Sequence, residues 1–322
     1  MTLRHQGRHL PATHEAFAAA FPNPSNRVCI FVHSLAATEW LWSLSSQSHY
    51  GDPDVTFGTR LRDDLGYTPI YLRYNTGRHI SENGKALAKL ITEALDAYPV
   101  PIDEIALVGH SMGGLVARNY IRNYINLPEN IAPRKVRRLV TMGTPSYGGL
   151  FADTDFGGAL LNNQAEDLEY GALVTWKLHR DWSNPALRDR LPECLAIVGT
   201  NDAAFGRYNQ TDVVVTCSSG SLENLGFPVY YVPLGHSGAF SPIGTDGLAV
   251  IDDINHESWP ALEAFLTSPD ATVPAHLPGH FGNADDVGDP GHPEPLPNGA
   301  LYVVKADSNG NQQTITAVDM GH

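Results

Sequence analysis

A serine flanked by glycines lies at the junction of a predicted strand and a predicted helix. Residues 105–108 form an apolar run, and Gly109, Ser111 and Gly113 follow it in the spacing Gly-X-Ser-X-Gly. Apolar residues then recur at helical spacing, which predicts a strand, a sharp turn and a helix. In this context the motif is typical of a nucleophile elbow, whose strained turn lifts the serine hydroxyl above the edge of a sheet. Ser111 is therefore the candidate nucleophile; the alternative is a serine that caps the helix beginning near Met112.

A nucleophilic serine needs a neighbouring base, and the base needs a carboxylate that holds its tautomer. After an elbow of this kind the acid comes next along the chain and the histidine last. His236 directly follows a predicted strand and is the favoured base, with His256 as the alternative. Asp212 introduces an apolar run 24 residues before His236 and is the favoured acid, whereas Asp202, directly after a strand, is the alternative.

An oxyanion hole is expected after the strand-like run 28–32. This run ends in His33, Ser34 and Leu35. In lipase-like serine hydrolases a strand ends in a His-Gly-X turn, and the backbone N–H of X points at the carbonyl oxygen under attack. Leu35 would be X here, with Ser34 standing where glycine is usual. The N–H of Met112 is the expected second donor.

Strand-like and helical segments alternate around these residues. The predicted strands are 28–32, 69–74, 105–108, 136–141, 195–198 and 228–233, and the predicted helices include 87–98 and 259–266. Such alternation predicts an α/β fold with a mostly parallel central sheet flanked by helices.

The chain divides into a main domain and a tail. Residues 1–268 are predicted to form the domain, with 1–26 as a lead-in and a helical cap inserted at about 145–190, since long connections are usually functional. Residues 269–322 are rich in proline and glycine and contain two strand-like runs, 301–305 and 313–318, that predict a β-hairpin.

Composition excludes several partners. A net charge of −14 over 322 residues disfavours binding to a nucleic-acid backbone or an anionic membrane surface. No apolar stretch approaches the ~20 residues of a membrane span, so membrane insertion is not expected. The polar first residues lack a signal-peptide pattern, which predicts a cytoplasmic protein; a secreted protein trimmed of its signal peptide is the alternative.

The cysteines and acidic residues predict no metal centre. Cys29, Cys194 and Cys217 lack metal-ligand spacing; buried thiols are expected for the first two, with a Cys194–Cys217 bridge as the alternative. The tail acids that could bind a cation are Asp285, Asp286 and Asp289.

Several motifs together resemble those of the lipase-type α/β-hydrolases, in particular a bacterial branch similar to GPI inositol-deacylase. The matching segments are 32–35, 73–77, 109–118 and 141–145, and 211–219 is similar to the acid-bearing segment of bacterial lipases. The resemblance spans roughly residues 27 to 240. It implies an α/β-hydrolase fold and the hydrolysis of esters or lipids without an organic cofactor. It also supports Asp212 as the acid. Ser146 and Tyr147 depart from the family, where a histidine-containing turn is common.

The expected function is hydrolysis of carboxylic esters or lipids through Ser111, His236 and Asp212. The substrate partner is then a small-molecule ester or lipid. The same triad could instead transfer the acyl group to another alcohol. A third hypothesis is a binding protein that keeps the hydrolase fold without its chemistry, which the complete set of candidate residues disfavours.

Overall fold

The computed structural model describes the Gly-X-Ser-X-Gly motif and the strands and helices around it. The described ranges are 1–43, 46–124, 135–149, 167–168, 172–199, 215, 217–222, 225–232, 258–269, 303–306 and 312–315.

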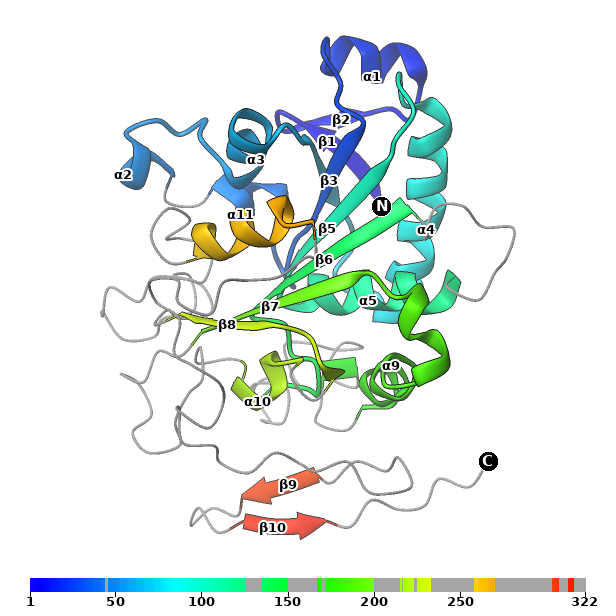
Figure 1. The fold of residues 1–322 in the computed structure, drawn as a ribbon, viewed down its shortest axis with the longest axis vertical. Helices are drawn as coiled ribbons and strands as arrows, with labels where there is room; N and C mark the ends of the chain where they lie inside the picture. Colours follow the sequence, from blue (N-terminus) through cyan, green and yellow to red (C-terminus); the bar gives the residue numbers. More distant parts are fainter. Residues whose placement is uncertain are drawn as a thin grey trace.

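An eight-stranded sheet forms the centre of the molecule, with the strand order β2-β1-β4-β3-β5-β6-β7-β8 (Figure 1). The strands are β1 (Thr2–His5), β2 (Arg8–Leu10), β3 (Arg27–Val32), β4 (Thr68–Arg73), β5 (Glu104–His110), β6 (Val136–Met142), β7 (Glu193–Gly199) and β8 (Val229–Val232). From β4 to β8 every neighbouring pair is parallel, and β1 pairs antiparallel with β4 and β2. The predicted α/β class with a mostly parallel sheet is confirmed.

Helices cover both faces of the sheet. They are α1 (His14–Ala20), α2 (Ser46–Tyr50), α3 (Phe57–Leu65), α4 (Ile80–Ala97), α5 (Met112–Tyr124), α9 (Leu173–Trp182), α10 (Cys217–Gly220) and α11 (Trp259–Thr267), with 3-10 turns η1 (Glu39–Ser43) and η2 (Pro185–Arg190). In Figure 1, α3 and α11 lie on one side of the sheet and α4 on the other.

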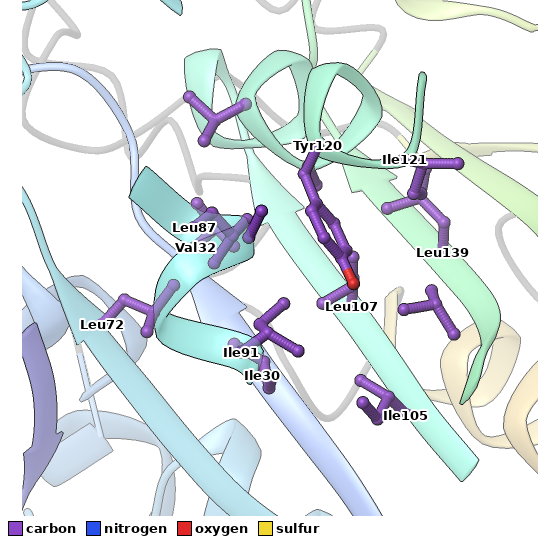
Figure 2. Close-up of a cluster of buried hydrophobic side chains, with 14 of the residues drawn as sticks. Ile30, Val32, Leu72, Leu87, Ile91, Ile105, Leu107, Tyr120, Ile121 and Leu139 are labelled. Atoms are coloured by element: carbon purple, nitrogen blue, oxygen red, sulfur yellow. The ribbon is translucent and has the colours of Figure 1, made fainter. Parts of the chain in front are cut away.

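Alternating strand residues build a separate core on each face. Ile30 and Val32 of β3 belong to the cluster that α4 and α5 cover, whereas Phe31 faces the cluster that includes α3 and α11. The alternation follows from the two-residue period of a strand. Figure 2 shows the first cluster, in which Leu87 of α4 and Tyr120 of α5 lie against the strand side chains. The helix before the elbow and the helix after it are thereby fixed on the same face.

The N-terminal residues are more structured than predicted. Instead of a lead-in, residues 1–26 contain a hairpin of β1 and β2, which extends the central sheet. They also contain the helix α1, whose N-cap Thr13 accepts a hydrogen bond from the Ala16 N–H. The prediction was wrong here because β1 and β2 are only four and three residues long and largely polar. Such short edge strands carry almost no periodic signal.

Two other predicted regions are described in part. Within the predicted cap, α9 is packed against α5, and residues 150–166 lie outside the described residues. In the tail, β9 (Val303–Ala306) and β10 (Gln312–Ile315) pair antiparallel. The division of the chain at residue 268 stays a prediction.

The cysteine prediction is confirmed for two residues. Cys29 and Cys194 are buried free thiols, so Cys194 is not bridged to Cys217. Burial raises the pKa of both thiols, which disfavours reactive thiolates.

Candidate active site

Ser111 sits at a strained bend between β5 and α5. Its φ angle is +53°, in the left-handed region that non-glycine residues rarely adopt. The Ser111 N–H donates to the Met142 carbonyl oxygen of the neighbouring strand over 2.8 Å, and the Gly114 N–H donates to the Ser111 carbonyl oxygen over 3.0 Å. These bonds hold a conformation that costs about 1–2 kcal/mol for a residue with a side chain. Such strain persists where surrounding contacts overdetermine it, typically at functional sites.

The glycines around Ser111 allow a close approach of three chain segments. A Cβ atom at Gly113 would lie 2.2 Å from the carbonyl oxygen of Val32, and one at Gly109 would lie 2.6 Å from the amide nitrogen of Gly114. Either contact would force backbone atoms of β3 or α5 to shift. The first turn of α5 therefore abuts the end of β3, where the predicted oxyanion loop begins.

The oxyanion loop, defined here as residues 33–37, leaves β3 beside the elbow. Val32 is in register with Gly109 of β5, so the residues after them emerge at the same edge of the sheet. Within the loop Ala36 has a φ of +55°, and its N–H donates to the Thr76 hydroxyl over 3.2 Å. Leu35, the predicted donor, is partly buried in this turn. The structure thus brings the loop of Leu35 and the helix start at Met112 to one edge.

His33 anchors this loop from within the core. Its side chain is fully buried and stacks on Tyr74 with 4.2 Å between ring centroids. The Tyr74 N–H donates to His33 Nε2 over 3.3 Å, so His33 Nδ1 carries the proton and donates to the Ser34 carbonyl oxygen over 2.9 Å. Burial lowers the pKa of His33 to about 4, which keeps the ring neutral near pH 7. A neutral ring is what this hydrogen-bond pattern requires.

The sequence matches a family model described as a PGAP1-like alpha/beta domain over residues 71–164. That range contains the nucleophile elbow. A search of curated protein sequences found no match.

Solved structures share the architecture at low sequence identity. The mature form of lipase BlEst2 from Bacillus licheniformis has a TM-score of 0.53 at 17% identity, over 78% of this chain and 94% of the lipase. Phospholipase PlaB from Legionella pneumophila also has a TM-score of 0.53 at 17% identity, over 76% of this chain and 61% of PlaB. At identities this low the similarity bears on the fold alone. The order of the strands and the bend at Ser111 agree with that fold. The fold is that of an α/β-hydrolase.

Within this α/β-hydrolase fold the remaining predicted triad residues lie outside the described residues. They are Asp202, Asp212, His236 and His256. What is described is where their segments start: β7 ends at Gly199 and β8 at Val232, and these two residues are in register. Both segments therefore begin at the edge of the sheet that carries Ser111.

A buried polar cluster beside the elbow was not expected from the sequence. Arg118 of α5 lies 4.8 Å from the ring centroid of Trp182 in α9, and the Tyr147 hydroxyl is 3.0 Å from Nδ1 of His179. Burial and the nearby Arg118 cation lower the pKa of His179 to about 4. The cluster joins the loop after β6 to α9 across the predicted cap segment. The one feature of the sequence that could have indicated this cluster is a charged residue, Arg118, on the otherwise apolar face of α5.

A second unexpected group supports the oxyanion loop from outside. Glu39 follows the loop and is 6% exposed, and its carboxylate accepts hydrogen bonds from Arg4 of β1 and Arg73 of β4. Burial opposes ionisation of Glu39, but the bonds from Arg73 and Arg4 outweigh it and lower its pKa. The N-terminal hairpin is thereby tied to η1, which closely follows the oxyanion loop.

The described residues contain no group of three or more His, Cys, Asp or Glu side chains that could hold a metal ion. Asp285, Asp286 and Asp289 lie outside them. Among the helices in the described ranges, none combines the length and apolarity that crossing a bilayer demands.

Proposed function

We propose that this protein is a serine carboxylic ester hydrolase, an esterase or lipase. The observation that carries the proposal is the left-handed backbone of Ser111, held between β5 and α5 next to the oxyanion loop. Glycine would adopt this backbone conformation without strain, so packing alone does not account for a serine at this position. The lipase-type fold supports the same reaction class, and the substrate is an ester or lipid.

His236 is the proposed base because its loop can reach the elbow. It lies four residues after Val232, the last residue of β8, and four extended residues span about 14 Å. From β8 to β5 there are three strand spacings, also about 14 Å. His256 lies just before α11, which packs on the opposite side of the sheet from α5, and remains the alternative.

Asp212 is the proposed acid, with Asp202 as the alternative. Both belong to the segment between Gly199 at the end of β7 and the buried Val215. Asp212 stands three residues before Val215, so its backbone is anchored close by. Asp202 stands three residues after Gly199 and is equally close to the sheet. Sequence similarity to bacterial lipases favours Asp212.

The proposed reaction runs in two halves. His236 Nε2 takes the Ser111 hydroxyl proton while Ser111 Oγ bonds to the ester carbonyl carbon, and the N–H groups of Leu35 and Met112 bind the resulting oxyanion. His236 then protonates the leaving alcohol as the C–O bond breaks. Water, deprotonated by His236, attacks the acyl-enzyme and releases the carboxylic acid with Ser111 regenerated.

Labelling by a fluorophosphonate, followed by mass spectrometry, tests the nucleophile. We expect one adduct, on Ser111, and no adduct in Ser111→Ala, together with hydrolysis of p-nitrophenyl esters by the unmodified protein. Absence of both label and turnover would favour the non-catalytic alternative. Added alcohols would reveal acyl transfer as new ester products, and a series of acyl chain lengths would separate esterase from lipase.

Paired substitutions assign the acid and the base. A neutral amide at the true acid should lower kcat by about 10⁴-fold. We therefore expect Asp212→Asn to show this loss and Asp202→Asn to stay near the unmodified rate, with the same contrast between His236→Ala and His256→Ala. The reverse pattern would reassign the residue and leave the reaction class intact.

The proposed hydrolase unit is residues 1–268, with the cap at about 145–190 covering the site. The tail, 269–322, is proposed to be an extension outside the catalytic unit. Deleting the tail should leave kcat for short-chain esters within about twofold, because the described machinery lies wholly before it.

A further inference from the structure

Ser219 connects two segments that flank the proposed catalytic machinery. It lies in the short helix α10 and is 1% exposed. Its partners are three consecutive residues of the loop that leaves β6, residues 143–149, named here the β6 loop. The Ser146 N–H donates to the Ser219 carbonyl oxygen over 2.9 Å and the Tyr147 N–H donates to Ser219 Oγ over 3.1 Å. Ser219 Oγ in turn donates to the Gly148 carbonyl oxygen over 2.5 Å.

The β6 loop touches the nucleophile elbow. It starts at Gly143, whose N–H donates to the Ile197 carbonyl oxygen of β7 over 2.9 Å. Thr144, the next residue, lies so close to α5 that a Cβ at Gly114 would be 2.1 Å from its Oγ1. A displacement of the β6 loop would therefore also displace the start of α5, which lies beside Ser111.

On its other side α10 packs against β7, the strand that precedes the segment with the two candidate acids, named here the acid segment. A Cβ at Gly220 would lie 3.2 Å from a methyl group of Val198 in β7, so α10 packs against the Val198 side chain. Both candidate acids, Asp202 and Asp212, lie between the end of β7 and the buried Val215 that precedes α10. The end of the acid segment is thus held next to Ser219.

We propose that Ser219 is a positioning residue that fixes the β6 loop against the start of α5 and so holds Ser111 in place. This inference rests on the proposed hydrolase function. The hydroxyl is the element that matters: it satisfies one N–H and one carbonyl oxygen of the β6 loop, and buried backbone groups left without partners are unfavourable. Without it the β6 loop shifts, and the position of Ser111 at the start of α5 loosens.

The test compares Ser219→Ala with Ser219→Thr, which restores a hydroxyl. A matched control is Thr68→Ala, because Thr68 at the amino end of β4 is 4% exposed and its hydroxyl accepts the Ser25 N–H over 2.9 Å. We expect Ser219→Ala to lower kcat about tenfold or more, with little change in KM. Its fluorophosphonate labelling rate should fall in parallel, and Ser219→Thr should recover most of both.

Thr68→Ala should lower the melting temperature while kcat stays unchanged, which separates positioning from stability. If Ser219→Ala does not fold, Ser219→Cys decides in the same way, because a thiol is a weak hydrogen-bonding group. A labelled, active protein whose Ser219→Ala or Ser219→Cys variant keeps full kcat would overturn the positioning role alone. An unmodified protein that neither labels nor hydrolyses esters would overturn the proposed function, and this role with it.

Discussion

The hydroxyl of Tyr74 donates a hydrogen bond to the backbone carbonyl oxygen of His33 over 2.6 Å, from the end of β4 to the first residue of the oxyanion loop. The same tyrosine donates its N–H to the His33 ring and stacks against it. The loop that carries the proposed oxyanion donor Leu35 is therefore oriented by a strand on the far side of β3 from the elbow. Oxyanion donors act only when they are already in place.

Tyr74→Phe should therefore slow the proposed reaction. It removes the bond to the His33 carbonyl oxygen and leaves the ring stack in place, so we expect kcat to fall about tenfold while KM changes little. Steady-state kinetics with a p-nitrophenyl ester measures both parameters. Tyr98→Phe is the control, because Tyr98 donates in the same way to the Ser25 carbonyl oxygen over 2.9 Å at the other end of the sheet. Equal losses of kcat in both variants would contradict this role.

Replacing Ser111 by glycine should make the protein more stable than replacing it by alanine. Glycine adopts a φ of +53° without the steric conflict of a Cβ. We expect Ser111→Gly to exceed Ser111→Ala in free energy of unfolding by about 1 kcal/mol, with both variants inactive. Urea unfolding of the two proteins gives the difference. Equal stabilities would mean that the elbow carries no backbone strain.

Gly113→Ala should be far more harmful than Gly66→Ala. A Cβ at Gly113 would lie 2.2 Å from the Val32 carbonyl oxygen, whereas one at Gly66 has no heavy atom within 4 Å and meets only an unfavourable φ of +70°. We expect about 1 kcal/mol of destabilisation for Gly66→Ala and at least about 3 kcal/mol, or failure to fold, for Gly113→Ala. Thermal unfolding measures both. A mild effect at Gly113 would show that α5 can move away from β3.

Acid should destabilise the protein through His33. Its pKa is about 4 in the folded state, against an ordinary histidine value of 6.5, so the unfolded chain binds the proton more readily. The stabilising effect of the neutral ring is complete above pH 6.5, declines as the pH falls, and levels off below about 4. The full difference is about 3 kcal/mol.

Unfolding free energies at pH 7 and pH 4.5 measure this effect. In His33→Gln, whose side-chain oxygen can still accept the Tyr74 N–H, the decline between the two pH values should be smaller than in the unmodified protein. His179, with a pKa also lowered to about 4, contributes equally to both proteins. An identical decline in both would assign the acid sensitivity to other groups.

Neutralising Glu39 should destabilise the protein strongly. Glu39→Gln leaves Arg4 and Arg73 without their shared carboxylate in a largely buried site, and breaking a buried ion pair from one side costs about 3 kcal/mol. The control Asp64→Asn breaks the more exposed pair with Arg60 and should cost about 0.5 kcal/mol. Chemical denaturation compares the two. Similar small losses would show that the cluster is not a support of the oxyanion loop.

How much of the site could be predicted from the sequence depended on how far apart along the chain the interacting residues lie. The Gly-X-Ser-X-Gly spacing and the apolar run before it were enough to predict the strand, the bend at Ser111 and α5, because each is set by neighbours along the chain. The parallel sheet followed from the alternation of such segments. Asp202, Asp212, His236 and His256 stay predictions, since they lie outside the described residues.

Local patterning by itself predicted Ser111 as the nucleophile and determined the order of the central elements and the α/β class, since periodicity and turn residues act over a few positions. Only the tertiary structure decided that Tyr74 holds His33, that Glu39 ties Arg4 to Arg73, and that Ser219 holds the β6 loop. These partners are separated by 34 to 71 residues along the chain. They meet because strand register and helix packing bring distant segments together, and no periodic pattern records which polar groups will then face each other.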